Sequence, residues 1–157
     1  MRSLHVIMPM AGEGSRFVNE GWTMPKPLIE VNGKPLFLRA IESLPKDIEI
    51  KYSFIVRKNH IESHHIDERI KYHLPNASIF SVSKTTRGAV ETCLVAESVI
   101  EDDDAVIIMD CDLEFKSKDF IDNIKALLNV SHTKCGGVLL SFKSNLPKYS
   151  YAETDKY

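Results

Sequence analysis

The sequence is poor in cysteine, has no basic excess and contains no long apolar run. Its three cysteines, Cys93, Cys111 and Cys135, are widely spaced and match neither a C-x-x-C zinc pattern nor a disulfide framework. Lys and Arg number 20 against 22 Asp and Glu, and this net charge of −2 argues against a nucleic-acid partner. No apolar stretch is long enough to span a bilayer, which argues against membrane insertion. We expect reduced, mostly buried thiols.

The amino terminus lacks the features of a signal peptide. Met1-Arg2-Ser3 leads directly into an apolar run, without a long apolar region and a small-residue cleavage site. The 157 residues are 43% apolar and 27% charged, which is ordinary for a globular protein of one domain. We therefore expect a single cytoplasmic domain over residues 1–157.

Apolar runs alternate with helical periodicities along the chain. The patterns predict strands at residues 4–8, 28–31, 48–56, 78–82, 105–109 and 136–142, and helices at 35–44, 59–74, 89–100 and 117–128. This alternation predicts an α/β fold: a Rossmann-like three-layer sandwich with a mostly parallel central sheet. Residues 145–157 are polar, and 149–153 could begin another strand without a capping element. Either this tail is disordered or the chain is the front part of something longer.

Residues 9–28 combine two glycines and two cations directly after the first predicted strand, where an α/β fold has its phosphate-binding loop. Gly12 and Gly14 allow backbone N–H groups to approach an anion, and Arg16 and Lys26 add positive charge. The stretch is neither a Walker loop nor a dinucleotide fingerprint, because no Gly-Lys-Ser/Thr triplet follows and Phe17 replaces a glycine. Prolines on both sides restrict the backbone of Lys26, which favours a triphosphate site over a surface loop with incidental charges.

Two aspartates follow the most apolar predicted strand. If the strands are parallel, Asp110 and Asp112 lie at the same sheet edge as the glycine loop, and hard oxygen donors at this spacing suit Mg²⁺. The alternative is a pair of solvated turn residues. The acidic run at 102–104 precedes the strand and is expected to be a solvated turn at the opposite edge.

Four histidines at 60, 64, 65 and 73 suggest a metal site only superficially. His60 and His64 could share a helix face as in zinc sites, but a third ligand at typical spacing is missing. Solvated surface histidines on a polar helix are the better interpretation.

The run Pro-Met-Ala-Gly-Glu-Gly-Ser-Arg-Phe, followed by Met-Pro-Lys-Pro-Leu-Ile-Glu-Val-Asn-Gly-Lys-Pro-Leu, resembles the signature of sugar-phosphate nucleotidyltransferases. These are the pyrophosphorylases of the glycosyltransferase-A-like superfamily. The resemblance covers residues 4–44 closely and continues more weakly through 86–89 and 108–112 to about residue 120. It implies that fold, in a form truncated to its amino-terminal part.

The resemblance also implies roles for individual residues. Arg16 would hold the β- and γ-phosphates of an NTP as the leaving group, and Lys26 would neutralise the α-phosphate. The nucleotide would be bound by Met10, Ala11, Gly12, Gly14, Ser15, Thr86 and Gly88. Asp112 matches the first Mg²⁺ ligand of the family, whereas Asp110 stands where many members have a non-acidic residue.

The implied reaction is transfer of NMP from an NTP to a sugar phosphate or related phosphorylated compound, with release of pyrophosphate. The Pro9-Met10 opening resembles a branch linked to surface-polysaccharide biosynthesis, and related branches activate choline phosphate or other non-sugar phosphates with CTP. Family members are longer, and the acceptor-binding part is missing from this sequence. The alternatives are a non-catalytic nucleotide-binding module and a glycosyltransferase that uses Asp110-x-Asp112. A homo-oligomer is compatible with each of these functions.

Overall fold

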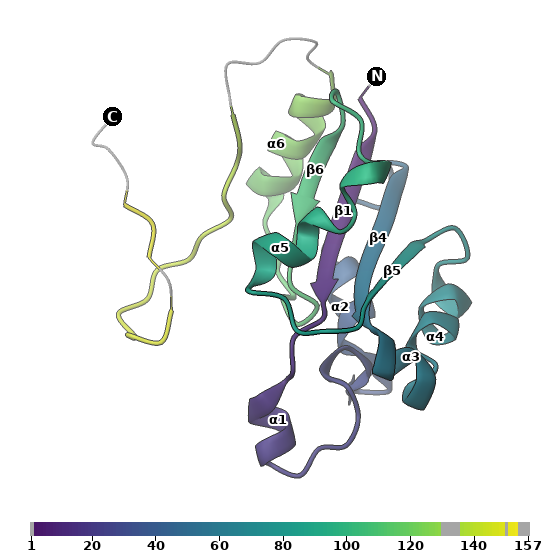
Figure 1. Cartoon of the computed structure of the whole chain (residues 1–157). Helices are drawn as coiled ribbons and strands as arrows, with labels where there is room; N and C mark the ends of the chain where they lie inside the picture. Colours follow the sequence, from purple (N-terminus) through teal and green to yellow (C-terminus); the bar gives the residue numbers. More distant parts are fainter. Residues whose placement is uncertain (1, 130–135, 150, 154–157) are drawn as a thin grey trace.

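The computed structural model describes residues 2–129, 136–149 and 151–153, and its centre is a four-stranded parallel sheet (Figure 1). The strand order is β5-β4-β1-β6, with β1 (Leu4–Met10) between β4 (Ile50–Arg57) and β6 (Ala105–Ile108). Strand β5 (Ser78–Val82) pairs with the far side of β4. Consecutive parallel strands are joined by helical crossovers, as the alternation predicts. The predicted α/β fold is confirmed.

Helices cover the two faces of the sheet unequally. On the face that carries Val6 and Met8 of β1, the core is completed by helices α2 (Leu36–Ile41), α4 (Ile66–His73) and α6 (Lys118–Asn129). Their buried anchors include Phe37, Ile70 and Leu128. The opposite face has a smaller core in which α5 (Ala89–Leu94) packs against Ile7 and Ile55. The loops at the carboxyl ends of the strands are therefore positioned by a sheet that is packed on both faces.

The predicted helix at 59–74 is two helices in the structure. Helix α3 (Lys58–His64) ends where His65 adopts φ +50°, and α4 begins directly afterwards. A residue in the left-handed region ends an α-helix, and the apolar periodicity continues across it because α4 buries Ile66 and Ile70. The predicted helix at 89–100 is likewise interrupted: α5 ends at Leu94, and the 3-10 helix η2 (Glu97–Val99) follows.

Local sequence signals mark the starts of two other helices and a hairpin turn. The amide of Phe120 donates to Ser117 Oγ at 3.2 Å, so Ser117 caps α6 at the start of the helix predicted over 117–128. The helix predicted at 35–44 is shorter in the structure: α2 runs from Leu36 to Ile41, and Pro35 precedes it as the capping residue. Before it, strands β2 (Glu30–Val31) and β3 (Lys34–Pro35) form a short hairpin. Its turn residues Asn32 and Gly33 have φ +55° and +72°, as a tight hairpin turn requires.

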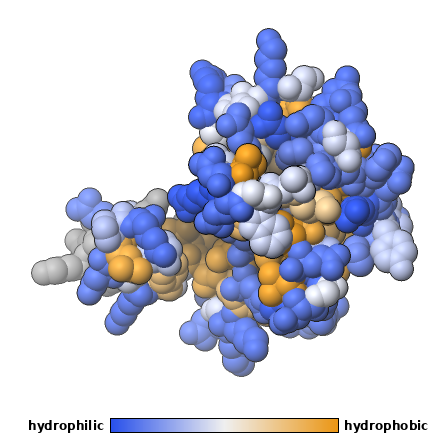
Figure 2. Space-filling model, turned by 90° about the horizontal axis from the view of Figure 1, so that it is seen from below, coloured by the Kyte–Doolittle hydropathy of each residue, from blue (hydrophilic) through white to orange (hydrophobic). Residues whose placement is uncertain are grey.

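The strand predicted at 136–142 is wrong. Residues 136–149 and 151–153 contain no helix or strand, and Leu139 and Phe142 are 75% and 67% exposed. Strand β6 therefore remains an edge strand with Ile108 62% exposed. Figure 2 shows this segment as a lobe beside the body of the molecule. An apolar alternating run forms a strand only where a neighbouring strand pairs with it and a core buries it, and the segment has neither.

The other structural predictions concern the cysteines and the membrane. Cys93 and Cys111 are buried free thiols, as predicted, and Cys135 lies outside the described residues. Among the helices in the described ranges, none has the length and apolar character needed to cross a membrane.

Candidate functional site

The glycine loop starts from a rigid anchor at the carboxyl edge of the sheet. Met10 at the end of β1 and Ala11 are 3% and 2% exposed, and the chain leaves the core immediately after them. Gly14 has φ +61° and precedes helix α1 (Ser15–Asn19), which has no buried residue and projects below the sheet (Figure 1). The loop therefore offers its backbone and side chains to solvent, as binding of a ligand at this edge requires.

Lys26 is held by a buried proline on each side. It begins the 3-10 helix η1 (Lys26–Leu28), whose capping residue is Pro25. Pro25, Pro27 and Leu28 are all buried, so the backbone of this short segment is attached firmly to the core. The side chain of Lys26 is 30% exposed and points out of that anchor. The backbone restraint predicted for Lys26 is thus present in the structure.

The structure brings Lys26 together with Asp112, which follows β6. Lys26 Nζ lies 2.7 Å from Asp112 Oδ2, and the same ammonium lies 5.9 Å from the centre of the Phe17 ring. These residues line an open hollow of about 490 Å³ at the carboxyl edge. The full lining is Gly14, Ser15, Arg16, Phe17, Glu20, Lys26 and Asp112. Five of the eleven predicted site residues therefore surround one space.

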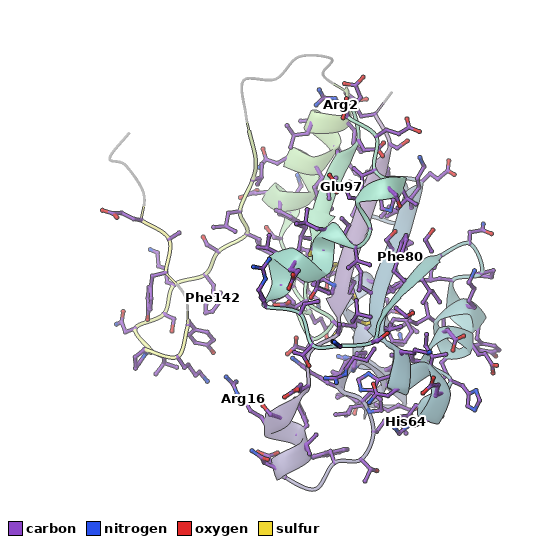
Figure 3. The ribbon with its side chains drawn as sticks, viewed as in Figure 1. Arg2, Arg16, His64, Phe80, Glu97 and Phe142 are labelled. Carbon is purple, nitrogen blue, oxygen red and sulfur yellow. The ribbon has the colours of Figure 1, made fainter. Side chains whose placement is uncertain are left out.

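Arg16 is the free cation of this hollow. Its side chain is exposed, and within residues 2–129, 136–149 and 151–153 no hydrogen bond or ion pair engages its guanidinium. Figure 3 shows the side chain extending away from α1. A guanidinium with five unused donors can bind a phosphate group through two parallel hydrogen bonds.

Asp110 does not line the hollow with Asp112. The chain alternates at this point, so that Cys111 turns into the core while both aspartates are exposed. Burial raises the pKa of Cys111 to about 12. Burial also raises the pKa of Cys93 on α5, and the charge of Asp110 adds to this effect. The structure therefore separates the two predicted metal ligands: Asp112 faces the cations, and Asp110 lies toward α5.

The residues present suit a Mg²⁺ ion that arrives with a phosphorylated ligand. In the described part of the chain, no group of three or more His, Cys, Asp or Glu residues could hold a metal by itself. Mg²⁺ keeps several waters and binds proteins through one or two carboxylates together with substrate phosphates. Asp112, half-exposed and beside a space large enough for phosphates, is a donor of this kind.

Thr86 and Gly88, two further predicted site residues, lie in a second loop at the carboxyl edge of the sheet, between β5 and α5. The hydroxyls of Thr86 and Thr92 are hydrogen-bonded to each other at 2.6 Å, and the carbonyl oxygen of Gly88, 3.2 and 3.1 Å from them, accepts from the hydroxyl whose proton is not used in that bond. Gly88 itself is exposed at the start of α5. Sequence patterns did not single out Thr92, because its role depends on a contact across the first turn of α5.

The two loops are linked by residues that sequence reasoning also missed. Thr85 Oγ1 donates to Glu13 Oε1 at 3.1 Å, and Arg57 Nη1 lies 3.4 Å from Thr85 Oγ1 and 3.7 Å from Glu13 Oε1. We call Glu13, Arg57 and Thr85 the loop clasp. Glu13 and Thr85 follow β1 and β5, and Arg57 is the last residue of β4, so only the strand order brings the three together.

The four histidines at 60, 64, 65 and 73 form no metal site with other residues of the described part of the chain. The rings of His60 and His64 lie on one face of α3 with their centres 6.3 Å apart, but the described residues supply no third ligand. His65 and His73 are exposed as predicted. His60 differs from the prediction because it is half-buried, with its Nδ1 atom unpaired and its pKa lowered by burial and, less strongly, by Arg57. His60 and His64 line a smaller cavity that adjoins the hollow and shares Gly14, Phe17 and Lys26 with it.

Known proteins resemble this chain in fold. A Bacillus anthracis protein described as a glucose-1-phosphate thymidylyltransferase superposes with a TM-score of 0.60 at 18% identity, over 81% of this chain and 51% of its own. The inositol-1-phosphate CTP transferase from T. maritima gives 0.59 at 18% identity, over 73% and 46%. The nucleoside-diphosphate-sugar pyrophosphorylase from Vibrio cholerae RC9 gives 0.51 at 24% identity, over 70% and 50%.

These similarities define the fold and the extent of the match. The chain has a nucleotidyltransferase fold and spans about half the length of the solved structures named above. No protein-family model matches it, and no curated protein matches it at a significant level.

Proposed function

We propose that this chain is the NTP-binding part of a Mg²⁺-dependent nucleotidyltransferase. It would transfer a nucleotidyl group from an NTP to a phosphorylated small molecule and release pyrophosphate. The observation that carries the proposal is the single hollow in which Arg16, Lys26 and Asp112 meet beside a glycine loop. Anionic triphosphate, metal and cationic side chains are the components that phosphoryl-type transfer needs, because it depends on positioning and charge neutralisation.

In the proposed reaction, a phosphate oxygen of the acceptor attacks the α-phosphorus of the NTP. A new bond forms between these two atoms, and the bond from the α-phosphorus to the oxygen that bridges to the β-phosphate breaks. Lys26 neutralises the charge that builds on the α-phosphate, and Arg16 binds the departing pyrophosphate. Mg²⁺ bound at Asp112 would supply further charge neutralisation at the phosphates. A general base is unnecessary, because a phosphate oxygen is already ionised at neutral pH.

Sugar phosphates are the acceptor class that we propose first. The names of the fold neighbours refer to glucose 1-phosphate and inositol 1-phosphate, which are phosphate esters of polyhydroxylated rings. We further propose that the product supplies polysaccharide biosynthesis in the cytoplasm. Choline phosphate and similar non-sugar phosphates are the second acceptor class.

The proposal is tested by binding and turnover measured side by side on the intact natural protein. Calorimetric titration with ATP, CTP, GTP, UTP and dTTP in the presence of Mg²⁺ identifies the donor, and pyrophosphate release is followed with each acceptor. Lys26→Ala should abolish pyrophosphate release while leaving the fold intact. A matched control is Lys34→Ala, which removes an exposed ion pair with Glu42 outside the hollow. Unchanged turnover in Lys26→Ala would contradict the proposed function.

A non-catalytic nucleotide-binding module is the second candidate. It rests on the same hollow, because Arg16 and Lys26 beside the glycine loop are sufficient to bind phosphate groups without any turnover. Nucleotide binding without pyrophosphate release for any acceptor would support it. The glycosyltransferase alternative is weaker, because Asp110 is separated from Asp112 and because two cations already line the hollow. Sugar transfer from a nucleotide sugar would revive it.

A further inference from the structure

The loop clasp ties together two loops and the end of a strand, which are far apart in the sequence. Glu13 lies between Gly12 and Gly14 of the glycine loop, Arg57 ends β4, and Thr85 lies in the loop after β5. Thr85 Oγ1 donates to Glu13 Oε1 at 3.1 Å, and the guanidinium of Arg57 approaches both partners. The clasp therefore spans the carboxyl ends of β5, β4 and β1, three of the four strands of the sheet.

Each end of the clasp adjoins a part of the proposed nucleotide site. Gly14, next to Glu13, lines the hollow that contains Arg16 and Lys26. The hydroxyl of Thr86, next to Thr85, lies 3.2 Å from the carbonyl oxygen of Gly88 at the start of α5. An NTP that uses both loops needs them at a fixed separation, since its triphosphate and its base are covalently connected. A binding site whose parts are already correctly spaced loses less entropy when the ligand binds.

We propose that Arg57 is a positioning residue that fixes the spacing between the glycine loop and the loop at 83–88, and that it thereby determines NTP affinity. This inference rests on the proposed function of the site. Arg57 acts through Glu13 and Thr85 and is not itself a lining residue of the hollow.

The position of Arg57 suits this role. The backbone of Arg57 pairs with Val82 in the sheet, and the preceding Val56 is fully buried. The Arg57 side chain therefore extends from backbone that the sheet holds in place. This side chain is 21% exposed, whereas that of Glu13 is 64% exposed and belongs to a loop with little buried surface. The planar guanidinium stays charged at every relevant pH and can donate to two acceptors at once.

Arg57 also compensates the negative charge of Glu13 in the glycine loop. Glu13 adds a negative charge next to the hollow proposed for a triphosphate, and the cation of Arg57 lies 3.7 Å from its carboxylate. Removing Arg57 alone would thus have two effects: the spacing between the loops would no longer be fixed, and the negative charge of Glu13 would lose its cationic partner. A test of positioning has to remove both charges together.

The experiment compares two double variants that leave the net charge unchanged. Glu13→Ala with Arg57→Ala opens the clasp. Lys58→Ala with Glu62→Ala removes the adjacent ion pair on α3, whose atoms lie 3.8 Å apart, and serves as the matched control. Affinities are measured by calorimetry for the NTP preferred by the wild type and for inorganic triphosphate, which lacks a base and needs only the glycine loop.

We expect the clasp variant to bind the NTP about 5-fold more weakly, as loss of about one net hydrogen bond would produce, and inorganic triphosphate less than about 2-fold more weakly. The control variant should match the wild type with both probes. In a second arm, the single variant Arg57→Lys should bind the NTP more tightly than the clasp variant and more weakly than the wild type, because lysine keeps the charge but not the planar fork. Equal losses for both probes, or no loss for the NTP, would overturn the positioning role.

Hydrogen exchange without any ligand separates this inference from the proposed function. Amides of residues 84–88 should exchange faster in the clasp variant than in the control or the wild type, because the loop loses its tie to Glu13. If the wild type bound no NTP, the proposed function would fail while this arm still tested the clasp. Unchanged exchange at 84–88 would show that the clasp does not hold the loop and would overturn the inference.

Discussion

The ammonium of Lys26 lies 2.7 Å from Asp112 Oδ2, so the lysine predicted to act on a phosphate pairs with the aspartate predicted to hold a metal. Both side chains are partly exposed, at 30% and 41%, and the pair is therefore held weakly enough to exchange partners. A divalent cation at Asp112 would compete with Lys26 for the same oxygen atom. The lysine released in this way would be free to turn toward a phosphate.

This competition predicts an effect on metal affinity without nucleotide. Lys26→Ala should raise the affinity for Mn²⁺, used as a spectroscopic probe for Mg²⁺, by about 3-fold, the value of a partly exposed ion pair. Asp112→Asn should weaken Mn²⁺ binding instead. Electron paramagnetic resonance of free Mn²⁺ measures both, with Lys34→Ala as the control. Weaker Mn²⁺ binding by Lys26→Ala would contradict the competition.

Gly14 provides a test of the loop geometry. Its φ of +61° disfavours any residue with a Cβ atom, whereas a Cβ added at Gly12 meets no atom within 4 Å and φ there is not in the left-handed region. Gly14→Ala should therefore lower the free energy of unfolding by about 1–2 kcal/mol, and Gly12→Ala should change it much less. Urea denaturation measures the difference. Equal stabilities of the two variants would show that the loop rearranges without strain.

The burial of His5 predicts how the free energy of unfolding depends on pH. The residue is 2% exposed, its Nε2 atom lies 2.9 Å from Ser53 Oγ, and its Nδ1 atom has no partner. Burial lowers its pKa below the usual 6.5, although Asp104 opposes the shift. The unfolded chain therefore binds a proton that the folded chain rejects, and stability should fall as the pH decreases from about 7 through 6.5 and below.

Substitution separates His5 from other titrating groups. His5→Gln should flatten this pH dependence, because glutamine does not titrate and can still hydrogen-bond to Ser53. His65→Asn, which replaces an exposed histidine in the left-handed region with a residue that tolerates it, should leave the dependence unchanged. Chemical denaturation between pH 5 and about 8 provides the measurement. An unaltered profile in His5→Gln would assign the dependence to another group, such as His60.

Cys111 predicts slow thiol chemistry. Its pKa of about 12 and its 6% exposure leave little thiolate and little access at pH 8. In a Cys135→Ser background, labelling by a disulfide reagent should be slow in the native protein and rapid in denaturant. Mass spectrometry of peptides locates the label. Fast native labelling at Cys111 would contradict its burial beneath the exposed Asp112.

Local patterns predicted most of the fold. The apolar runs at Leu4 and Ala105 form neighbouring parallel strands, Ser117 caps its helix, and Pro25 and Pro27 restrain Lys26 as expected. These features depend on residues close together in the chain. The helices predicted at 59–74 and 89–100 are each interrupted in the structure, the first at the left-handed residue His65, and the run at 136–142 forms no strand because no strand pairs with it.

The sequence by itself determined the types of the main elements and the residues that occupy the glycine loop. Only the tertiary structure decided that Asp112, and not Asp110, faces Lys26, and that Arg57 joins the loops of Glu13 and Thr85. The reason is physical. Helix and strand patterns record local periodicity, whereas contacts between loops follow from the strand order β5-β4-β1-β6 and from the alternation of side chains at the strand ends.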